Sequence, residues 1–180
     1  PQEGRILVDG VDLRELPLRE WRHCLGMVLQ DLYLFPGNLR ENLTMGRDIP
    51  AESLQKAAEI TLAERFIRHL PAGDQTDLAE RGGNLSVGQR QLLSFTRALA
   101  GNPDLLILDE ATSAVDPATE HFLSTPTRRV LQGRTALIIA HRLSTIRHCQ
   151  RILVLQHGQI IERGTHQELL GIGGLYRTLH

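Results

Sequence analysis

The 180-residue sequence is poor in aromatic side chains, which make up only 4% of the chain. Proteins that bind single-stranded nucleic acid without sequence preference use aromatic rings as stacking platforms, so this class of function is not favoured. The 20 basic and 21 acidic residues leave a formal net charge of -1, which provides no overall field toward nucleic acid or anionic lipid. We therefore expect no nucleic-acid partner.

Cysteine and long apolar runs are also scarce. Cys24 and Cys149 fit neither a disulfide framework nor metal-ligand spacing, which indicates a reducing compartment and predicts two small buried hydrophobic residues. The longest apolar stretches, at 105–108, 136–140 and 152–155, are far shorter than the roughly 20 residues that cross a bilayer. We expect neither a membrane span nor a signal peptide in this sequence.

Short apolar segments alternate with helical patterns, which is typical of an α/β fold. The predicted strands lie at 5–8, 25–29, 105–108, 136–140 and 152–155. The last three lack a polar alternation, which predicts strands covered on both faces of a parallel sheet. A helix across 117–131 would supply the crossover between the first two of them.

The helical patterns begin at recognisable caps. Asn38 with Glu41, Ser86 with Gln89, and Thr165 with Glu168 have the spacing of capping boxes. The predicted helices lie at 18–24, 51–70, 86–100 and 117–131, with a short one after Thr165.

Two further features are local. Pro126 lies inside the 117–131 pattern, where it lacks a backbone donor and predicts a kink or break. Residues 156–159 predict a hairpin turn.

The segment at 105–108 ends in two carboxylates, Asp109 and Glu110. Ligands of open α/β sheets bind beyond the carboxyl ends of the strands, so both acids are expected at a site. Asp109 could bind Mg²⁺, directly or through water, and Glu110 could orient or deprotonate an attacking water. Taken alone, the pair is a weak signal, and a solvated strand end explains it better than a site does.

Further motifs accompany these acids in a fixed order. Gln30 ends the strand at 25–29, residues 84–91 read Asn-Leu-Ser-Val-Gly-Gln-Arg-Gln, residues 113–116 read Ser-Ala-Val-Asp, and His141 follows the segment at 136–140. This set resembles the ATP-binding cassette (ABC) ATPase family over residues 4–168. In that family's terms the segments match the Q-loop, the signature motif, the Walker B strand with its glutamate, the D-loop and the switch histidine.

The resemblance implies roles for individual residues. Glu110, His141 and Gln30 would be catalytic, Gln30 and Asp109 would bind Mg²⁺, and Ser86, Val87, Gly88, Gln89, Asp109 and Asp116 would bind the nucleotide.

Each of these residues also has a structural explanation. Ser86 and Gln89 are an ordinary capping box, Asp116 could cap the helix that starts at Pro117, His141 could be a core histidine, and Gln30 could simply close a strand. Val87 departs from the glycine that is commonest in the family's signature motif.

The sequence contains no Gly-x4-Gly-Lys-Ser/Thr loop, since its only lysine is Lys56 in Gln55-Lys56-Ala57. In the family this Walker A loop precedes the segment that resembles residues 4–12, so we expect the chain to begin just after it. The resemblance then implies a P-loop NTPase-like ABC ATPase fold without its first segment. The expected division is an ATPase-core remnant at 1–37, a helical subdomain at 38–100 and the remaining ATPase core at 101–180.

The function implied is the motor domain of an ABC exporter at the cytoplasmic face of a membrane. It would bind ATP and Mg²⁺, form a head-to-tail dimer with a second ABC ATPase domain, and act on a transmembrane domain. Without Walker A, the 180 residues alone are expected to be inactive, with exposed strand edges and apolar surface. A non-catalytic or degenerate half-site and a soluble, non-transport ABC ATPase are the alternatives.

Overall fold

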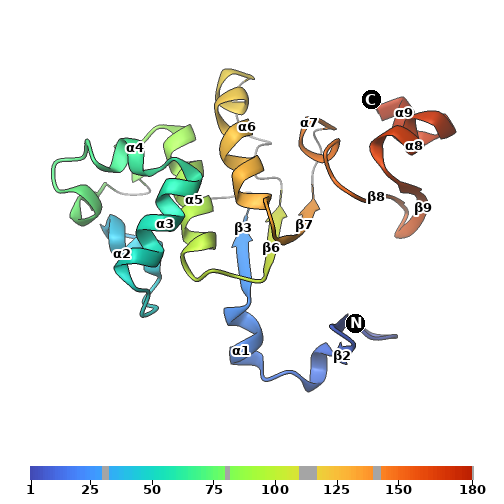
Figure 1. Ribbon diagram of the computed structural model, residues 1–180, viewed down its shortest axis with the longest axis horizontal. Helices are drawn as coiled ribbons and strands as arrows, with labels where there is room; N and C mark the ends of the chain where they lie inside the picture. The colour runs from blue at the N-terminus through green and yellow to red at the C-terminus, as the bar shows by residue number, and fades with distance from the viewer. Residues whose placement is uncertain (30–32, 80–81, 110–116, 140–142, 180) are drawn as a thin grey trace.

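The computed structural model describes residues 1–29, 33–79, 82–109, 117–139 and 143–179, and Figure 1 shows how its elements are arranged. The helices are α1 (Leu18–His23), α2 (Leu39–Thr44), α3 (Ala51–Thr61), α4 (Glu64–Ile67), α5 (Val87–Ala100), α6 (Pro117–Leu131), α7 (Leu143–Ile146), α8 (His166–Ile172) and α9 (Leu175–Leu179), with short 3-10 helices η1 (Leu13–Glu15) and η2 (Gly73–Gln75). The strands are β1 (Leu7–Val8), β2 (Val11–Asp12), β3 (Leu25–Val28), β4 (Gly37–Asn38), β5 (Asp77–Leu78), β6 (Leu105–Asp109), β7 (Thr135–Ile139), β8 (Ile152–Gln156) and β9 (Gln159–Gly164).

The centre of the molecule is a parallel sheet with strand order β3-β6-β7. Val28 pairs with Leu108, and Asp109 pairs with Ile139, so the carboxyl ends of the strands lie at one edge. Helix α6 connects β6 to β7, as a crossover between parallel strands requires. The strands predicted at 25–29, 105–108 and 136–140 and the crossover helix are therefore confirmed.

One face of this sheet carries the main core. Val28, Leu106 and Leu108 are buried in a cluster that includes residues of α3, α5 and α6. On the other face, Met27 and Leu137 are exposed, at 48% and 54%, and Leu105 and Ile107 of the central strand are half-buried. The prediction that these strands are covered on both faces is wrong, because the described helices that share this core pack together on a single face of the sheet.

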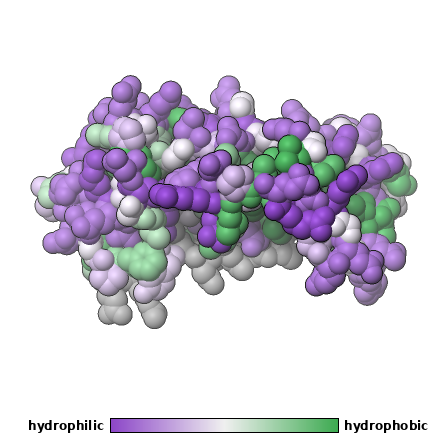
Figure 2. Space-filling view, turned by 90° about the horizontal axis from the view of Figure 1, so that it is seen from below, coloured by the Kyte–Doolittle hydropathy of each residue, from purple (hydrophilic) through white to green (hydrophobic). Residues whose placement is uncertain are grey.

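Apolar side chains are exposed on other strands as well. Leu7 and Val11 on β1 and β2, Leu155 on β8 and Ile160 on β9 are between 42% and 62% exposed. Figure 2 shows hydrophobic residues gathered in patches on the face seen from below. This surface agrees with the apolar exposure expected from the sequence.

The strand predicted at 152–155 has a different partner from the one expected. Strand β8 pairs with β9 in an antiparallel hairpin and does not join the parallel sheet of the described residues. The hairpin turn at 156–159 is confirmed, with positive φ at His157 and Gly158, the backbone conformation of a two-residue hairpin turn. The tight turn decides the pairing, because β9 follows β8 immediately and satisfies its backbone groups.

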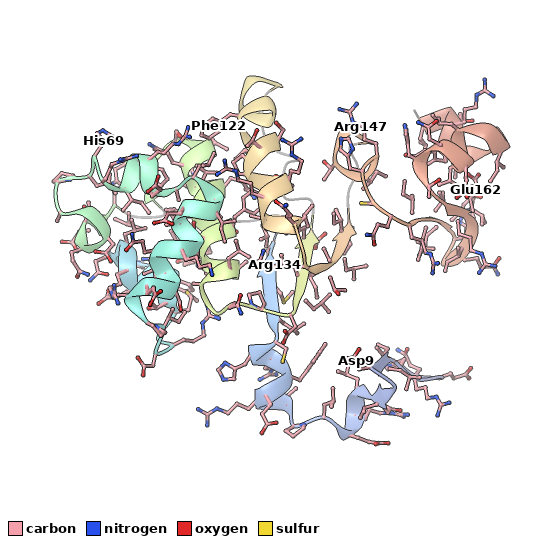
Figure 3. All side chains as sticks on the ribbon, in the orientation of Figure 1. Asp9, His69, Phe122, Arg134, Arg147 and Glu162 are labelled. Atoms are coloured by element: carbon pink, nitrogen blue, oxygen red, sulfur yellow. The ribbon has the colours of Figure 1, made fainter. Side chains whose placement is uncertain are left out.

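The hairpin and the last helices form a second, smaller core. It consists of Ile152, Val154, Leu169 and Tyr176, with a few half-buried neighbours. Glu162 on β9 accepts hydrogen bonds from the backbone of Leu175 and Tyr176 at the start of α9, and Figure 3 shows it beside the final helices. The capping box of Thr165 and Glu168 is present as predicted.

The helix predicted at 51–70 is broken. Helix α3 ends at Thr61, Leu62 adopts the left-handed conformation with φ of 63°, and α4 begins at Glu64. The Thr61 hydroxyl hydrogen-bonds to the carbonyls of Ala57 and Ala58 and approaches the Thr96 hydroxyl at 2.7 Å. Such side-chain bonds compete with the backbone ladder and explain why the helix ends there.

Helix α6, in contrast, continues through Pro126, so the break considered from the sequence does not occur. Pro126 is buried on the same face as Leu123 and Val130, whereas Phe122 is 52% exposed and lies at the outer surface in Figure 3. Proline removes the bond to the carbonyl four residues earlier, which here belongs to Phe122. Burial of the proline ring offsets part of that loss.

The sequence predicts that both cysteines are buried, but neither is fully buried in the structure. Cys24 and Cys149 are free and half-buried, and burial raises the pKa of the Cys149 thiol. Among the described residues, no helix is both long and apolar enough to cross a membrane.

Helix α5 lies very close to β3. A Cβ atom at Gly26 would be 2.6 Å from the Ala98 carbonyl oxygen, 2.7 Å from Pro103 Cγ and 2.8 Å from Leu106 Cδ2. These distances leave no room for any side chain, so only glycine permits this packing.

We predict that Gly26→Ala lowers the free energy of unfolding by about 2–3 kcal/mol, since overpacking forces the backbone of α5 to move. Gly171→Ala is the matched control, because nothing lies within 4 Å of its Cβ position on α8. It should stabilise the chain by about 0.5 kcal/mol through helix propensity. Urea denaturation measures both, and equal stability of the two variants would contradict the packing argument.

Candidate functional site

The first turn of α5 carries the residues predicted to bind a phosphate. Ser86 is the N-cap, and its hydroxyl accepts from the Gln89 backbone at 3.1 Å while the Gln89 side chain accepts from the Ser86 backbone at 2.9 Å. The capping box is therefore confirmed. Among the described residues, the amides of Val87 and Gly88 have no acceptor. A helix start with free amides favours an anion.

The two residues of this turn differ in exposure. Val87 is 46% exposed, whereas Gly88 is buried. The valine side chain therefore lies on the solvent side of the first turn, where it adds bulk without occupying the core.

The turn before Ser86 is held by local hydrogen bonds. The Asn84 side chain accepts from the Ala79 backbone at 3.2 Å, and the Leu85 amide donates to the Gly82 carbonyl at 2.9 Å. Gly82 has φ of +68°, and a Cβ atom there would lie 2.5 Å from Leu34 Cδ1. These contacts fix the direction in which the chain enters α5.

The second part of the candidate site is the carboxyl edge of the parallel sheet. Asp109 is the last residue of β6 and is half-buried. Its register partner is Ile139, the last residue of β7, and β3 ends at Val28, opposite Leu108. The chain segments that contain Glu110, Gln30 and His141 therefore continue from neighbouring strand ends.

The side chains of four predicted site residues lie outside the described residues: Gln30, Glu110, Asp116 and His141. Their gathering at the strand edge stays a prediction. Of the predicted set, the structure describes Ser86, Val87, Gly88, Gln89 and Asp109.

The two parts of the site are well separated along α5. The helix rises about 18 Å between Ser86 and Ala98, whereas β3 extends only about 7 Å from Gly26 to Val28. Since Gly26 and Ala98 are in contact, the start of α5 projects beyond the end of β3, as Figure 1 also shows. The strand edge and the start of α5 therefore lie apart within this chain.

Sequence reasoning missed the residues that tie α5 to α2. Arg97 on α5 and Asn42 on α2 connect through hydrogen bonds across 55 positions of sequence. The Glu41-Asn42-Leu43 run is visible in the sequence, but no local pattern indicates its partner.

Known proteins are similar to this chain over more than half of its length. The family model for ABC transporters matches residues 1–113. The chain belongs to the ABC transporter family. A solved bacterial Atm1-family ABC exporter with ATP bound is similar to this chain, with a TM-score of 0.87 and 41% identity. The match covers 99% of this chain and 32% of the exporter chain. The fold is accordingly that of an ABC ATPase.

Curated members of the ABC family are similar over nearly the whole chain. A putative ABC transporter ATP-binding protein, exp8, of Streptococcus pneumoniae is 45% identical over 99% of the chain and 31% of its own length. A fatty acid ABC transporter ATP-binding/permease protein of Mycobacterium tuberculosis is 48% identical over 96% and 28%. An ATP-dependent lipid A-core flippase of Legionella pneumophila is 45% identical over 99% and 30%. The chain thus spans about a third of the length of these ABC relatives.

We predict that Ser86→Ala lowers the free energy of unfolding by about 1 kcal/mol, whereas Ser86→Asp changes it by less than about 0.5 kcal/mol, because Asp caps helices as well as Ser does. Thr165→Ala, which removes the cap of α8, is the control for the loss of an ordinary cap. Chemical denaturation provides the comparison. An unchanged Ser86→Ala variant beside a destabilised Thr165→Ala variant would show that the Ser86 cap has no structural role.

Proposed function

We propose that this chain is the ATP-binding and ATP-hydrolysing motor part of an ABC exporter. The observation that carries the proposal is the separation of the two half-sites on one chain. A phosphate bound to the amides of Val87 and Gly88 would be too far from Asp109 of the same chain. One chain therefore could not supply both contacts to the same phosphate. A second ABC ATPase domain, arranged head to tail, would bring the start of its α5 to the strand edge of the first.

The residues present fit a magnesium-bound nucleotide. The Asp109 carboxylate is a hard oxygen ligand of the kind that Mg²⁺ prefers, and it lies half-buried at the strand edge. Gln30 would complete the contact with the ion, which neutralises charge on the phosphate oxygens when bound. The opposing first turn, formed by Ser86, Val87, Gly88 and Gln89, would hold the terminal phosphate through the helix dipole and the amides of Val87 and Gly88.

The remaining residues carry the chemistry in this proposal. Glu110 would orient the attacking water and accept its proton, and His141 would contact the terminal phosphate and the same water. Asp116 would line the seam between the two ATPase domains. Nucleotide binding would then close the dimer, and hydrolysis would reopen it and move a transmembrane domain at the cytoplasmic face of a membrane.

Relatives favour an exporter over a soluble ABC ATPase, since their names describe a permease and a flippase. The degenerate half-site is the weaker alternative, because Glu110 is retained in the sequence. The 180 residues contain no Walker A loop, so we infer that this segment alone neither binds ATP tightly nor hydrolyses it.

The head-to-tail arrangement can be tested by complementation in the full polypeptide. Glu110→Gln should lower ATP turnover at least about 100-fold by removing the general base. Ser86→Asp should do so by placing a carboxylate against the terminal phosphate. Glu59→Gln, which alters an exposed carboxylate on α3, should retain full turnover.

Mixing the two inactive variants distinguishes the models. Each mixed dimer contains one site with both substitutions and one intact site, so equal mixing should restore about a quarter of the original turnover. No restored turnover would contradict the shared site. Full turnover by Glu110→Gln alone would contradict the catalytic assignment.

A further inference from the structure

Arg97 on α5 is a half-buried cation without a carboxylate partner among the described residues. Its Nε donates to the Asn42 carbonyl at 2.8 Å, its Nη1 to the Tyr33 carbonyl at 3.0 Å, and its Nη2 to Asn42 Oδ1 at 3.5 Å. Burial, and then the nearby Arg47, lower the pKa of Arg97. A charge removed from water without a counter-ion costs free energy, so packing alone would favour an apolar residue at this position.

Asn42 extends the contact from Arg97 to the neighbouring segment. Its side chain is buried, and its Oδ1 accepts from the Phe35 amide at 2.8 Å. Its Nδ2 donates to the carbonyls of Phe35 at 2.9 Å and Asn38 at 3.1 Å. Arg97 and Asn42 thus hold the backbone at both ends of the segment 33–35.

The middle of that segment contacts the turn before α5. Leu34 is 1% exposed, and its side chain fills the space beside Gly82, where a Cβ atom would be 2.5 Å away. The Gly82 carbonyl accepts from Leu85, directly before Ser86. The segment that follows Gln30 and residues 31–32 is therefore held by the turn that precedes Ser86 and by the helix that follows it.

We propose that Arg97, in the last turn of α5, is a positioning residue that joins this helix, whose first turn is the phosphate end, to the segment after Gln30. Through Arg97, Asn42 and Leu34, the start of α5 and residues 33–42 move as one unit. A change at the start of α5 on nucleotide binding is thereby transmitted to α2. This inference rests on the proposed function, because it requires that nucleotide act at the start of α5.

The test uses the full polypeptide with and without Mg²⁺-ATP, and follows hydrogen–deuterium exchange in the segments 33–43 and 87–91. Arg97→Gln removes both the charge and the planar guanidinium group with its several N–H donors. Arg97→Lys keeps the charge but not the guanidinium group. Arg40→Gln is the matched control, since Arg40 joins α2 to η2 through Asp74 at 3.1 Å and has no bond to α5. Turnover kinetics on the same samples separate kcat from KM.

In the unmodified protein and in Arg40→Gln, we expect ATP to change exchange in both segments. In Arg97→Gln, the response at 87–91 should remain while the response at 33–43 is lost, and kcat should fall about tenfold with KM for ATP nearly unchanged, as for loss of hydrogen bonds to a charged group. Arg97→Lys should give an intermediate response at 33–43.

A response of both segments in Arg97→Gln, as in the unmodified protein, overturns the proposal. If Arg97→Gln does not fold, Arg97→Lys decides, and an undiminished joint response in that variant has the same meaning. Absence of any ATP response at 87–91 in the unmodified protein is a different result, because it contradicts the proposed function itself.

Discussion

The contact between Gly26 of β3 and the Ala98 carbonyl of α5 sets the geometry on which the rest of the molecule depends. It holds the end of the long helix against the start of a short strand, so the opposite end of the helix must project beyond the sheet. Any larger side chain at residue 26 would tilt or shift α5. This close approach therefore helps to set how the helix start at Ser86 lies relative to the strand edge that contains Asp109.

Further contacts made by α5 fix the positions of the neighbouring elements. Thr61 on α3 meets Thr96 on α5 in the core, and Arg97, the next residue along α5, binds the segment 33–35. Adjacent positions of one helix therefore attach to different elements. Helices α2 and α3 pack on α5, and α5 packs on β3, so the main core is continuous between them, whether or not the 38–100 segment is counted as its own subdomain.

Local features of this fold could be predicted from the sequence because their causes are local. The capping boxes at Asn38, Ser86 and Thr165 each depend on two residues three positions apart, and the hairpin turn depends on His157 and Gly158. The parallel strands were recognisable from apolar runs that end at polar residues. The same reasoning placed Asp109 at the end of β6, while four other predicted site residues lie outside the described part.

What the sequence did not reveal depends on contacts between distant residues. The sequence near Thr61 does not indicate that its hydroxyl, at the end of α3, hydrogen-bonds to the hydroxyl of Thr96. The apolar run at 152–155 resembles a buried parallel strand, and only its pairing with β9 shows otherwise. Arg97 lies in an ordinary helical pattern, and its acceptors come from residues 33 and 42.

The C-terminal hairpin and helices have a small apolar core of their own, apart from the one around α5. Burial that is not shared between two clusters lets each lose its structure at its own free energy, so we expect the final thirty or so residues to unfold as a separate cooperative unit. Its opening would leave the parallel sheet intact. A molecule that binds only this unit would raise its stability by mass action without altering the rest of the chain.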